Sequence, residues 1–205
     1  PKQFLELEGA SVFIHTLRKF VASDIISEIF LGVRGEDRKR VESELSKENP
    51  KKAIRIILGG RSRQETVSNA LAQAPKDTEV VVVHDAVRPF VTPETIRKVV
   101  DAAQHEGAAI VAVPSIDTVK QVDRKLISTT IPRERIVLAQ TPQAFQFPVL
   151  REASDRARKD EFIGSDESSL VERMGRKVKV LMGSDYNIKI TKPSDLPLAR
   201  FFLSQ

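Results

Sequence analysis

The chain has 205 residues, 40% of them apolar, which is enough for one α/β domain with a full core, and no apolar run approaches the roughly 18 residues that a membrane helix needs. Because cysteine is absent, disulfides and thiolate metal sites are excluded; this fits a reducing compartment, and we expect a cytoplasmic protein with no membrane partner. The net charge of +5 comes with one tyrosine and no tryptophan, so a nucleic-acid partner is less expected than phosphorylated small molecules.

The first half of the chain predicts a regular alternation of helices and strands. Phe13, Leu17 and Phe20 share one face of a helix, and Thr92-Pro93-Glu94 is a typical helix start. Strands are expected at 26–33, 54–58, 79–83 and 108–113, and further helices at 37–47, 64–73 and 92–106. Alternation of this kind predicts a doubly wound, mostly parallel, Rossmann-like α/β sheet.

The strand at 79–83 is the centre of this expected sheet. Its four consecutive valines predict burial on both faces, as in central parallel strands. His84 and Asp85 end the apolar run, and Arg88 follows three residues later. Open α/β sheets bind ligands beyond the carboxyl ends of their strands, which makes Asp85 and Arg88 site candidates. A surface salt bridge on a connecting loop is the alternative, and we expect His84 to make a local hydrogen bond rather than to act as a base.

The second half of the chain departs from this alternation. Residues 117–122 and 126–131 predict a protruding β-hairpin arm at about 115–135. Because a polar hairpin is marginal alone, its expected partner is a second subunit, and we predict a homodimer. A single domain over residues 1–205 is completed by a polar turn at 139–143, helices at 148–159 and 167–174, strands at 177–182 and 187–191, and a last helix towards 202.

Polar groups are expected to gather at the carboxyl edge of the sheet. Gly59 and Gly60 interrupt the chain after a strand, and paired glycines permit positive φ and close approach of a ligand. The set 59–63, 85–88, Thr141 and Lys189, joined by Lys2, suits phosphate and a divalent metal. For Lys189, flanked by two isoleucines, a solvent-facing edge strand is the alternative. Neither G-x-G-x-x-G nor a P-loop is present, which argues against hydride transfer and a P-loop kinase.

Several segments together resemble the 2-C-methyl-D-erythritol 4-phosphate cytidylyltransferase family, the nucleotidyltransferases of the isoprenoid pathway. No single segment is decisive, but the set is specific and follows the family's order over essentially the whole chain. The segments are Pro1-Lys2-Gln3-Phe4-Leu5, His15-Thr16-Leu17, Gly59-Gly60 with Arg63 and Thr66, His84-Asp85-Ala86-Val87-Arg88-Pro89, Asp117-Thr118-Val119-Lys120, Thr141-Pro142-Gln143-Ala144-Phe145, Asp166-Glu167-Ser168-Ser169 and Asn187-Ile188-Lys189-Ile190-Thr191.

The resemblance implies transfer of CMP from CTP to 2-C-methyl-D-erythritol 4-phosphate, with Mg²⁺ as cofactor and release of pyrophosphate. It implies that Lys2 stabilises charge on the α-phosphate and that Arg133 and Lys189 position the attacking phosphate; these three are the expected catalytic residues. The expected nucleotide contacts are Lys2, Gly59, Gly60, Arg63, Thr66, Asp85, Ala86 and Lys189. The expected contacts of the polyol phosphate are Asp85, Arg88, Thr118, Arg133, Thr141, Ser165 and Lys189, and Asp85 is the candidate metal ligand. In a family-like dimer, Thr118 and Arg133 would reach the neighbouring subunit's site.

Two features depart from the family pattern. The family's first strand and glycine-rich phosphate loop, which precede the Pro-Lys-Gln segment, are missing from the chain as given. We expect an omitted segment rather than a truncated, inactive form. Ser165 stands where threonine is commoner, which keeps the hydroxyl. The alternatives are a ribitol 5-phosphate cytidylyltransferase, a non-catalytic nucleotide-binding protein and, least expected, a basic RNA-binding module.

Overall fold

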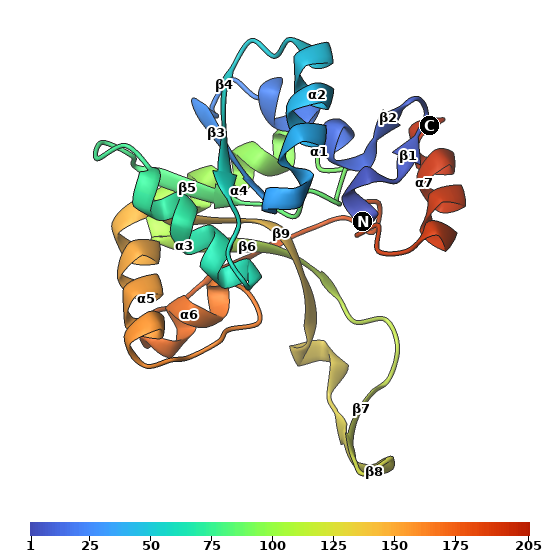
Figure 1. Cartoon of the computed structure of the whole chain (residues 1–205). Coiled ribbons are helices and arrows are strands. Elements are labelled where there is room, and N and C mark those ends of the chain that lie inside the picture. The colour runs from blue at the N-terminus through green and yellow to red at the C-terminus, as the bar shows by residue number, and fades with distance from the viewer.

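The computed structural model describes all 205 residues and has an α/β fold (Figure 1). The helices are α1 (Val12–Val21), α2 (Arg38–Glu48), α3 (Arg63–Gln73), α4 (Pro93–Glu106), α5 (Phe147–Lys159), α6 (Glu167–Arg173) and α7 (Leu196–Leu203). The strands are β1 (Glu6–Leu7), β2 (Ala10–Ser11), β3 (Glu28–Val33), β4 (Ala53–Leu58), β5 (Val80–Val83), β6 (Ala108–Pro114), β7 (Val119–Asp123), β8 (Leu126–Ile131), β9 (Val137–Gln146) and β10 (Lys179–Met182). As predicted, Thr92 caps α4: its hydroxyl accepts a 3.1 Å hydrogen bond from the Thr95 N–H.

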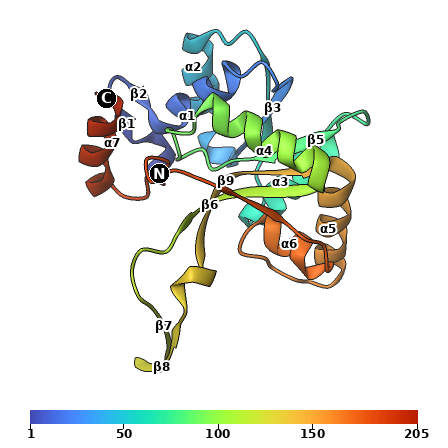
Figure 2. The ribbon, with the colours of Figure 1, turned by 180° about the vertical axis from the view of Figure 1, so that it is seen from behind.

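Helices cover both faces of a four-stranded sheet. On one face, which Figure 2 shows from behind, α4 packs Val99 and Ala103 against β6 and β9. On the opposite face, α5 and α6 pack against Ala108 and Phe145 of the same two strands. Ala109 and Ala144, the immediate neighbours of those residues, belong to the α4 layer. Successive side chains of a strand point to opposite faces, so the two buried layers follow directly from the apolar runs in β6 and β9.

The four-stranded sheet is mixed, so the expectation of a mostly parallel sheet is not confirmed. Its strand order is β10-β6-β9-β5, with β10 parallel to β6 and β9 antiparallel to both β6 and β5. After β6 the chain passes through β7 and β8 and returns beside β6, which reverses its direction. A separate two-stranded sheet contains β3 and β4, which are parallel.

Strand β9 replaces the polar turn that we expected at 139–143. Gln140, Thr141 and Gln143 are only 7%, 5% and 1% exposed. Pro142 cannot donate to a ladder, and it lies where the pairing with β6 shifts register. The Gln143 side chain donates to Asp166 Oδ2 at 2.7 Å and accepts from the Ser168 N–H at 3.2 Å. The polar residues that predicted a turn therefore belong to a buried strand whose hydrogen bonds are satisfied.

The strand predicted at 187–191 is also wrong. These residues pair with no strand, although the Ile190 N–H donates to the Val87 carbonyl at 2.9 Å. One backbone hydrogen bond ties the segment to the loop after β5 without forming a ladder. The apolar residues Ile188 and Ile190 predicted a strand. They are apolar because they pack into a small core with Leu7 and Val12, and this burial does not require strand pairing.

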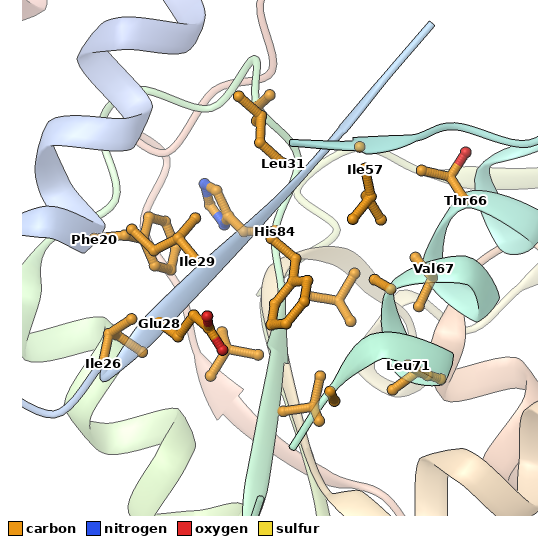
Figure 3. A pocket seen from close by; sticks show the side chains of 18 of the residues that line it. Phe20, Ile26, Glu28, Ile29, Leu31, Ile57, Thr66, Val67, Leu71 and His84 are labelled. Atoms are coloured by element: carbon orange, nitrogen blue, oxygen red, sulfur yellow. The ribbon is translucent and has the colours of Figure 1, made fainter. Parts of the chain in front are cut away.

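Strand β5 is an edge strand, contrary to the prediction of a central strand buried on both faces. It pairs only with β9, and its four valines are half-buried. Strand β3 likewise pairs only with β4. A groove of about 440 Å³ lies between them, and 18 of its 28 lining residues are hydrophobic, so it is mainly apolar (Figure 3). Phe20 and Ile29 line one side of this β3/β5 groove, and Val67 and Leu71 of α3 line the other.

Strands β7 and β8 form an antiparallel pair that extends away from the rest of the chain (Figures 1 and 2). Val122, Leu126 and Ile127 are 56%, 75% and 64% exposed, so apolar side chains on this pair have no partner within one chain.

No helix combines the length and the hydrophobicity that crossing a membrane would require.

Candidate functional site

Three cationic side chains converge on the carboxylate of Asp85. Lys189 Nζ lies 2.9 Å from Asp85 Oδ2, and Arg88 Nε lies 3.3 Å from the same oxygen. Arg63 Nε lies 3.4 Å from Asp85 Oδ1. We call these four residues the Asp85 cluster. They are four of the residues that the sequence analysis expected at the carboxyl edge of the sheet, and they come from distant parts of the chain.

The ends of two successive strand–helix units bring Asp85 and Arg63 together. Asp85 lies two residues beyond β5, and its N–H donates to Thr141 Oγ1 at 3.0 Å, which places another predicted residue at the cluster. Arg63 is the first residue of α3, whose N-cap Ser62 accepts a 3.1 Å hydrogen bond from the Glu65 N–H. Because α3 follows β4 directly, the carboxyl ends of β4 and β5 lie on the same side of the molecule.

The segment after β10 supplies Lys189. The hydrogen bond between Ile190 and Val87 places Lys189 beside the Asp85–Arg88 loop. Arg88 Nη1 donates to the Asn187 carbonyl at 2.7 Å, and Asn187 Nδ2 donates to the Thr141 carbonyl at 2.8 Å. Lys189 therefore points into the cluster and is not part of an edge strand, and 38% of its side chain is exposed to solvent.

Burial and charge oppose each other within the Asp85 cluster. Burial by itself raises the pKa of Asp85, but the hydrogen bond from Lys189 and the nearby cations bring that pKa below its ordinary value. For Arg88, burial dominates and lowers the pKa. For Arg63, burial also lowers the pKa, but Glu167 and Asp85 together raise it above its ordinary value. Asp85 and both arginines are consequently charged at neutral pH.

The Gly59–Gly60 turn is shaped by close packing rather than by positive φ. Neither glycine has a positive φ, so that part of the prediction is wrong. A Cβ atom on Gly60 would lie 2.3 Å from Glu65 Cγ, which leaves room only for glycine. The Gly60 N–H donates to Thr66 Oγ1 at 2.9 Å. This hydrogen bond attaches the glycine turn to the first turn of α3, close to Arg63.

No hydrogen bond or ion pair links the Asp85 cluster to Lys2, Thr118, Arg133 or Ser165. Thr118 lies just before β7 and Arg133 just after β8, and Arg133 Nη1 donates to the Ile116 carbonyl at 2.8 Å. Ser165 is exposed just before α6, and Lys2 is exposed in the N-terminal turn. Near that turn, Phe4 and the predicted residue Ala86 pack in the same core cluster. The chain start therefore lies beside the Asp85 loop, although Lys2 makes no ion pair with Asp85.

The sequence analysis did not identify Glu167 as a site residue. Its side chain is 2% exposed, and Arg63 Nη1 donates to Glu167 Oε2 at 2.5 Å. Burial raises the pKa of Glu167, and the charge of Arg63 opposes that rise. One signal in the sequence could have indicated a buried carboxylate here: Glu167 lies between the helix cap Asp166 and a run of small and apolar residues. Its partner was not predictable, because Arg63 is 104 residues away in the chain.

His84 makes the local hydrogen bond that we predicted. Its Nε2 lies 3.0 Å from the Arg88 carbonyl oxygen. Burial lowers the pKa of His84 to about 4, so the ring is neutral at pH 7. Its Nδ1 is buried without a partner, and the residue lines the β3/β5 groove.

The arrangement suits a polyanion and offers little to a metal on its own. Three cations face two carboxylates, Asp85 and Glu167, which leaves one excess positive charge. No group of three or more acidic or histidine side chains is arranged to hold a metal ion. Mg²⁺ commonly takes one or two protein carboxylates and completes its shell with phosphate oxygens and water. Asp85 fits that pattern only if a bound phosphate supplies most of the ligands.

Comparisons with known proteins agree on one family. A family model described as 2-C-methyl-D-erythritol 4-phosphate cytidylyltransferase matches residues 1–205. The chain is 50% identical to the protein of that name from Solibacter usitatus, covering 100% of this chain and 85% of the relative. It is 49% identical to the one from Acidobacterium capsulatum, covering 100% of this chain and 88% of the relative.

Solved structures give the same result. The enzyme of that name from Thermus thermophilus superposes with a TM-score of 0.84 at 32% identity, covering 100% of this chain and 95% of the other. A 4-diphosphocytidyl-2C-methyl-D-erythritol synthase from Anaerococcus prevotii superposes with a TM-score of 0.90 at 32% identity, covering 98% of this chain and 88% of the other.

The contacts in the Asp85 cluster predict that the pKa of Asp85 depends on Lys189. Lys189→Met removes the hydrogen bond and charge that lower the pKa of Asp85 while leaving its burial, so that pKa should rise. A ¹³C NMR titration of the Asp85 carboxyl group measures the change. Lys192→Met, which removes a nearby exposed cation, is the control and should leave the titration as in the wild type. An unchanged Asp85 titration in Lys189→Met would contradict the described contact.

Proposed function

The chain belongs to the 2-C-methyl-D-erythritol 4-phosphate cytidylyltransferase family, and we propose that the Asp85 cluster is where it carries out the family reaction. It is a nucleotidyltransferase of isoprenoid biosynthesis, which transfers CMP from CTP to 2-C-methyl-D-erythritol 4-phosphate. The observation that carries the assignment of the site is the convergence of Lys189, Arg88 and Arg63 on one carboxylate.

The chemistry calls for alignment of phosphates rather than for proton transfer. An oxygen of the polyol phosphate bonds to the α-phosphorus of CTP, the bond from that phosphorus to the β-phosphate oxygen breaks, and pyrophosphate leaves with the electron pair. The attacking oxygen is already anionic at neutral pH, so no general base is needed. Fixed cations that neutralise charge and hold two anions in line supply most of the rate enhancement in such reactions. The neutral, buried His84 has no role in this scheme.

We assign the nucleotide to the side of the cluster formed by Gly59, Gly60, Arg63, Thr66 and Ala86, with Lys2 approaching the α-phosphate. The location of Arg63 and the glycine turn at the start of α3 supports this assignment. The polyol phosphate would lie against Arg88, Thr141 and Lys189, with Ser165 at its margin. The partial exposure of Lys189, which leaves its ammonium accessible to a ligand, supports this half of the proposal.

We propose that Mg²⁺ enters with CTP. The triphosphate oxygens would supply most of its ligands, and Asp85 is the one protein carboxylate at the cluster that faces the proposed phosphate positions. When bound, the ion would withdraw charge from the phosphates. The role of this chain is to keep Asp85 ionised, which its three neighbouring cations do.

Lys189→Ala tests the site directly. We expect the substitution to lower kcat/KM by about 10²–10³-fold, because a fixed cation facing the transferring phosphate is lost. The melting temperature should change little, since the ammonium fills no core. Pyrophosphate release from CTP with 2-C-methyl-D-erythritol 4-phosphate measures the loss, and Lys192→Ala is the matched control. Near-normal turnover in Lys189→Ala would remove Lys189 from the site, and faster turnover with ribitol 5-phosphate would reassign the substrate.

We propose that the β7–β8 arm joins two copies of the chain. Its exposed apolar residues Val122, Leu126 and Ile127 support a partner surface. Thr118 and Arg133 lie in this arm region and do not reach the Asp85 cluster of their own chain. In a dimer with crossed arms, they would contribute to the partner's site.

Mixed dimers test this sharing of sites. Lys2→Ala and Arg133→Ala should each abolish most turnover alone. If Arg133 acts in the partner's site, co-refolding the two variants should restore roughly a quarter of the wild-type rate, because half the dimers are mixed and each has one intact site. Steady-state assays of the mixture and of each variant measure this. An inactive mixture in which mixed dimers have formed would argue for self-contained sites.

We propose that the β3/β5 groove receives a further β-strand and that this strand unites the two sheets. Both facing strands have an unpaired edge, and helices α1 and α3 line the groove above and below. The carboxyl ends of β4 and β5 share one side and β3 is parallel to β4, so a strand parallel to both β3 and β5 fits. The result would be the mostly parallel, doubly wound arrangement expected from the sequence. We propose that the family's first strand, upstream of Pro1, is the occupant.

Hydrogen exchange tests this proposal. In a chain extended upstream of Pro1, amides of β3 and β5 that face the groove should exchange at least about tenfold more slowly than in residues 1–205 alone, because new ladder bonds protect them. The amides of β6 serve as the internal control, because β6 is already paired on both sides. Equal exchange of the β3 and β5 amides in the two chains would contradict the proposal.

A cytoplasmic location of the protein stays a prediction.

A further inference from the structure

Glu167 is a buried carboxylate that the proposed chemistry does not use. It is 1% exposed as a residue, yet it carries an ionisable group that is costly to bury unless it is paired. Its ion-pair partner is Arg63, at 2.5 Å. The same guanidinium reaches Asp85 Oδ1 through its Nε, at 3.4 Å. Arg63 thus spans two carboxylates, one buried and one at the proposed phosphate site.

The position of Glu167 is set by a rigid frame. It begins α6, and the preceding residue Asp166 caps the helix by accepting from the Ser169 N–H at 3.0 Å. Gln143 of β9 binds both Asp166 and Ser168, which attaches the start of α6 to an interior strand of the sheet. The carboxylate of Glu167 is therefore a fixed point to which a flexible arginine side chain can be anchored.

We propose that Glu167 is a positioning residue that holds the Arg63 guanidinium at the angle needed to bind the phosphates of CTP. The proposal rests on the proposed function, in which CTP occupies the Asp85 cluster. Arg63 is 38% exposed and comes from the first turn of α3, so without an anchor its long side chain could turn to solvent or close onto Asp85. With Nη1 held by Glu167, the remaining N–H donors of the guanidinium stay directed towards the cluster.

A double-mutant cycle tests the proposal. Glu167→Gln keeps the size and one acceptor oxygen but removes the charge, and it should raise KM for CTP about tenfold while changing kcat less than about threefold. Arg63→Ala should raise KM for CTP at least as much. If Glu167 acts through Arg63, the double variant should match Arg63→Ala alone. Losses that multiply in the double variant, or a wild-type KM in Glu167→Gln, would overturn the proposal.

Glu172→Gln is the matched control. Glu172 lies on the same helix, is exposed, and accepts from Ser168 rather than from Arg63. It should leave KM for CTP unchanged, and an equal rise in KM in this variant would overturn the proposal by pointing to a general effect of α6. Should Glu167→Gln fail to fold, Glu167→Asp keeps the charge but shortens its reach. We expect a smaller rise in KM from Glu167→Asp, and a wild-type KM would overturn the proposal.

A measurement without CTP separates this proposal from the proposed function. In ¹⁵N NMR, the Arg63 Nη1 protons, one of which is donated to Glu167, should exchange with solvent at least about fivefold faster in Glu167→Gln than in the wild type, because their acceptor is weakened. Unchanged exchange would overturn the positioning role. If the wild-type protein turns over no CTP while Arg63 exchange still responds to Glu167, the proposed function fails and the anchoring stands.

Discussion

The carboxylate of Asp85 organises the site because it is the shared partner of three cations. Lys189 and Arg88 contact one oxygen and Arg63 contacts the other. These cations would repel one another strongly in a part-buried setting, and a single anion between them offsets much of that repulsion. Each cation then has donors left over, which is the condition for receiving phosphates. Asp85 and Glu167 thus offset two of the three positive charges, and the remaining one favours binding of a polyanion.

The buried polar residues of β9 connect this cluster to the rest of the fold. Thr141 accepts from the Asp85 N–H, and Gln143 holds the start of α6, from which Glu167 reaches Arg63. Each of these polar groups is satisfied, so their burial costs little and their geometry is well defined. One strand therefore positions both carboxylates of the site. Its antiparallel direction follows from the excursion through β7 and β8, which returns the chain to the sheet.

The four valines of β5 show how a correct local interpretation can give a wrong global one. Their run predicted a strand buried on both faces, yet β5 is an edge strand with half-buried side chains. The mismatch is explained if a strand occupies the β3/β5 groove, since the composition of β5 is that of a central strand. The apolar lining of the groove in Figure 3 has the same explanation.

Local chemistry in the sequence determined most of the helices, the strands β3 to β8 and the identity of the charged candidates. These features depend only on neighbouring residues, so they can be recognised without knowing the fold. They are the spacing of the apolar residues, the helix cap at Thr92 and the change from apolar to polar residues after Val83. Tertiary structure decided the direction of β9, the role of Glu167 and the irregular path of the segment that carries Lys189. Each of these depends on hydrogen bonds or ion pairs between residues far apart in the chain. Burial of a polar side chain is favourable only when its distant partner is in place, and no local pattern reveals that partner.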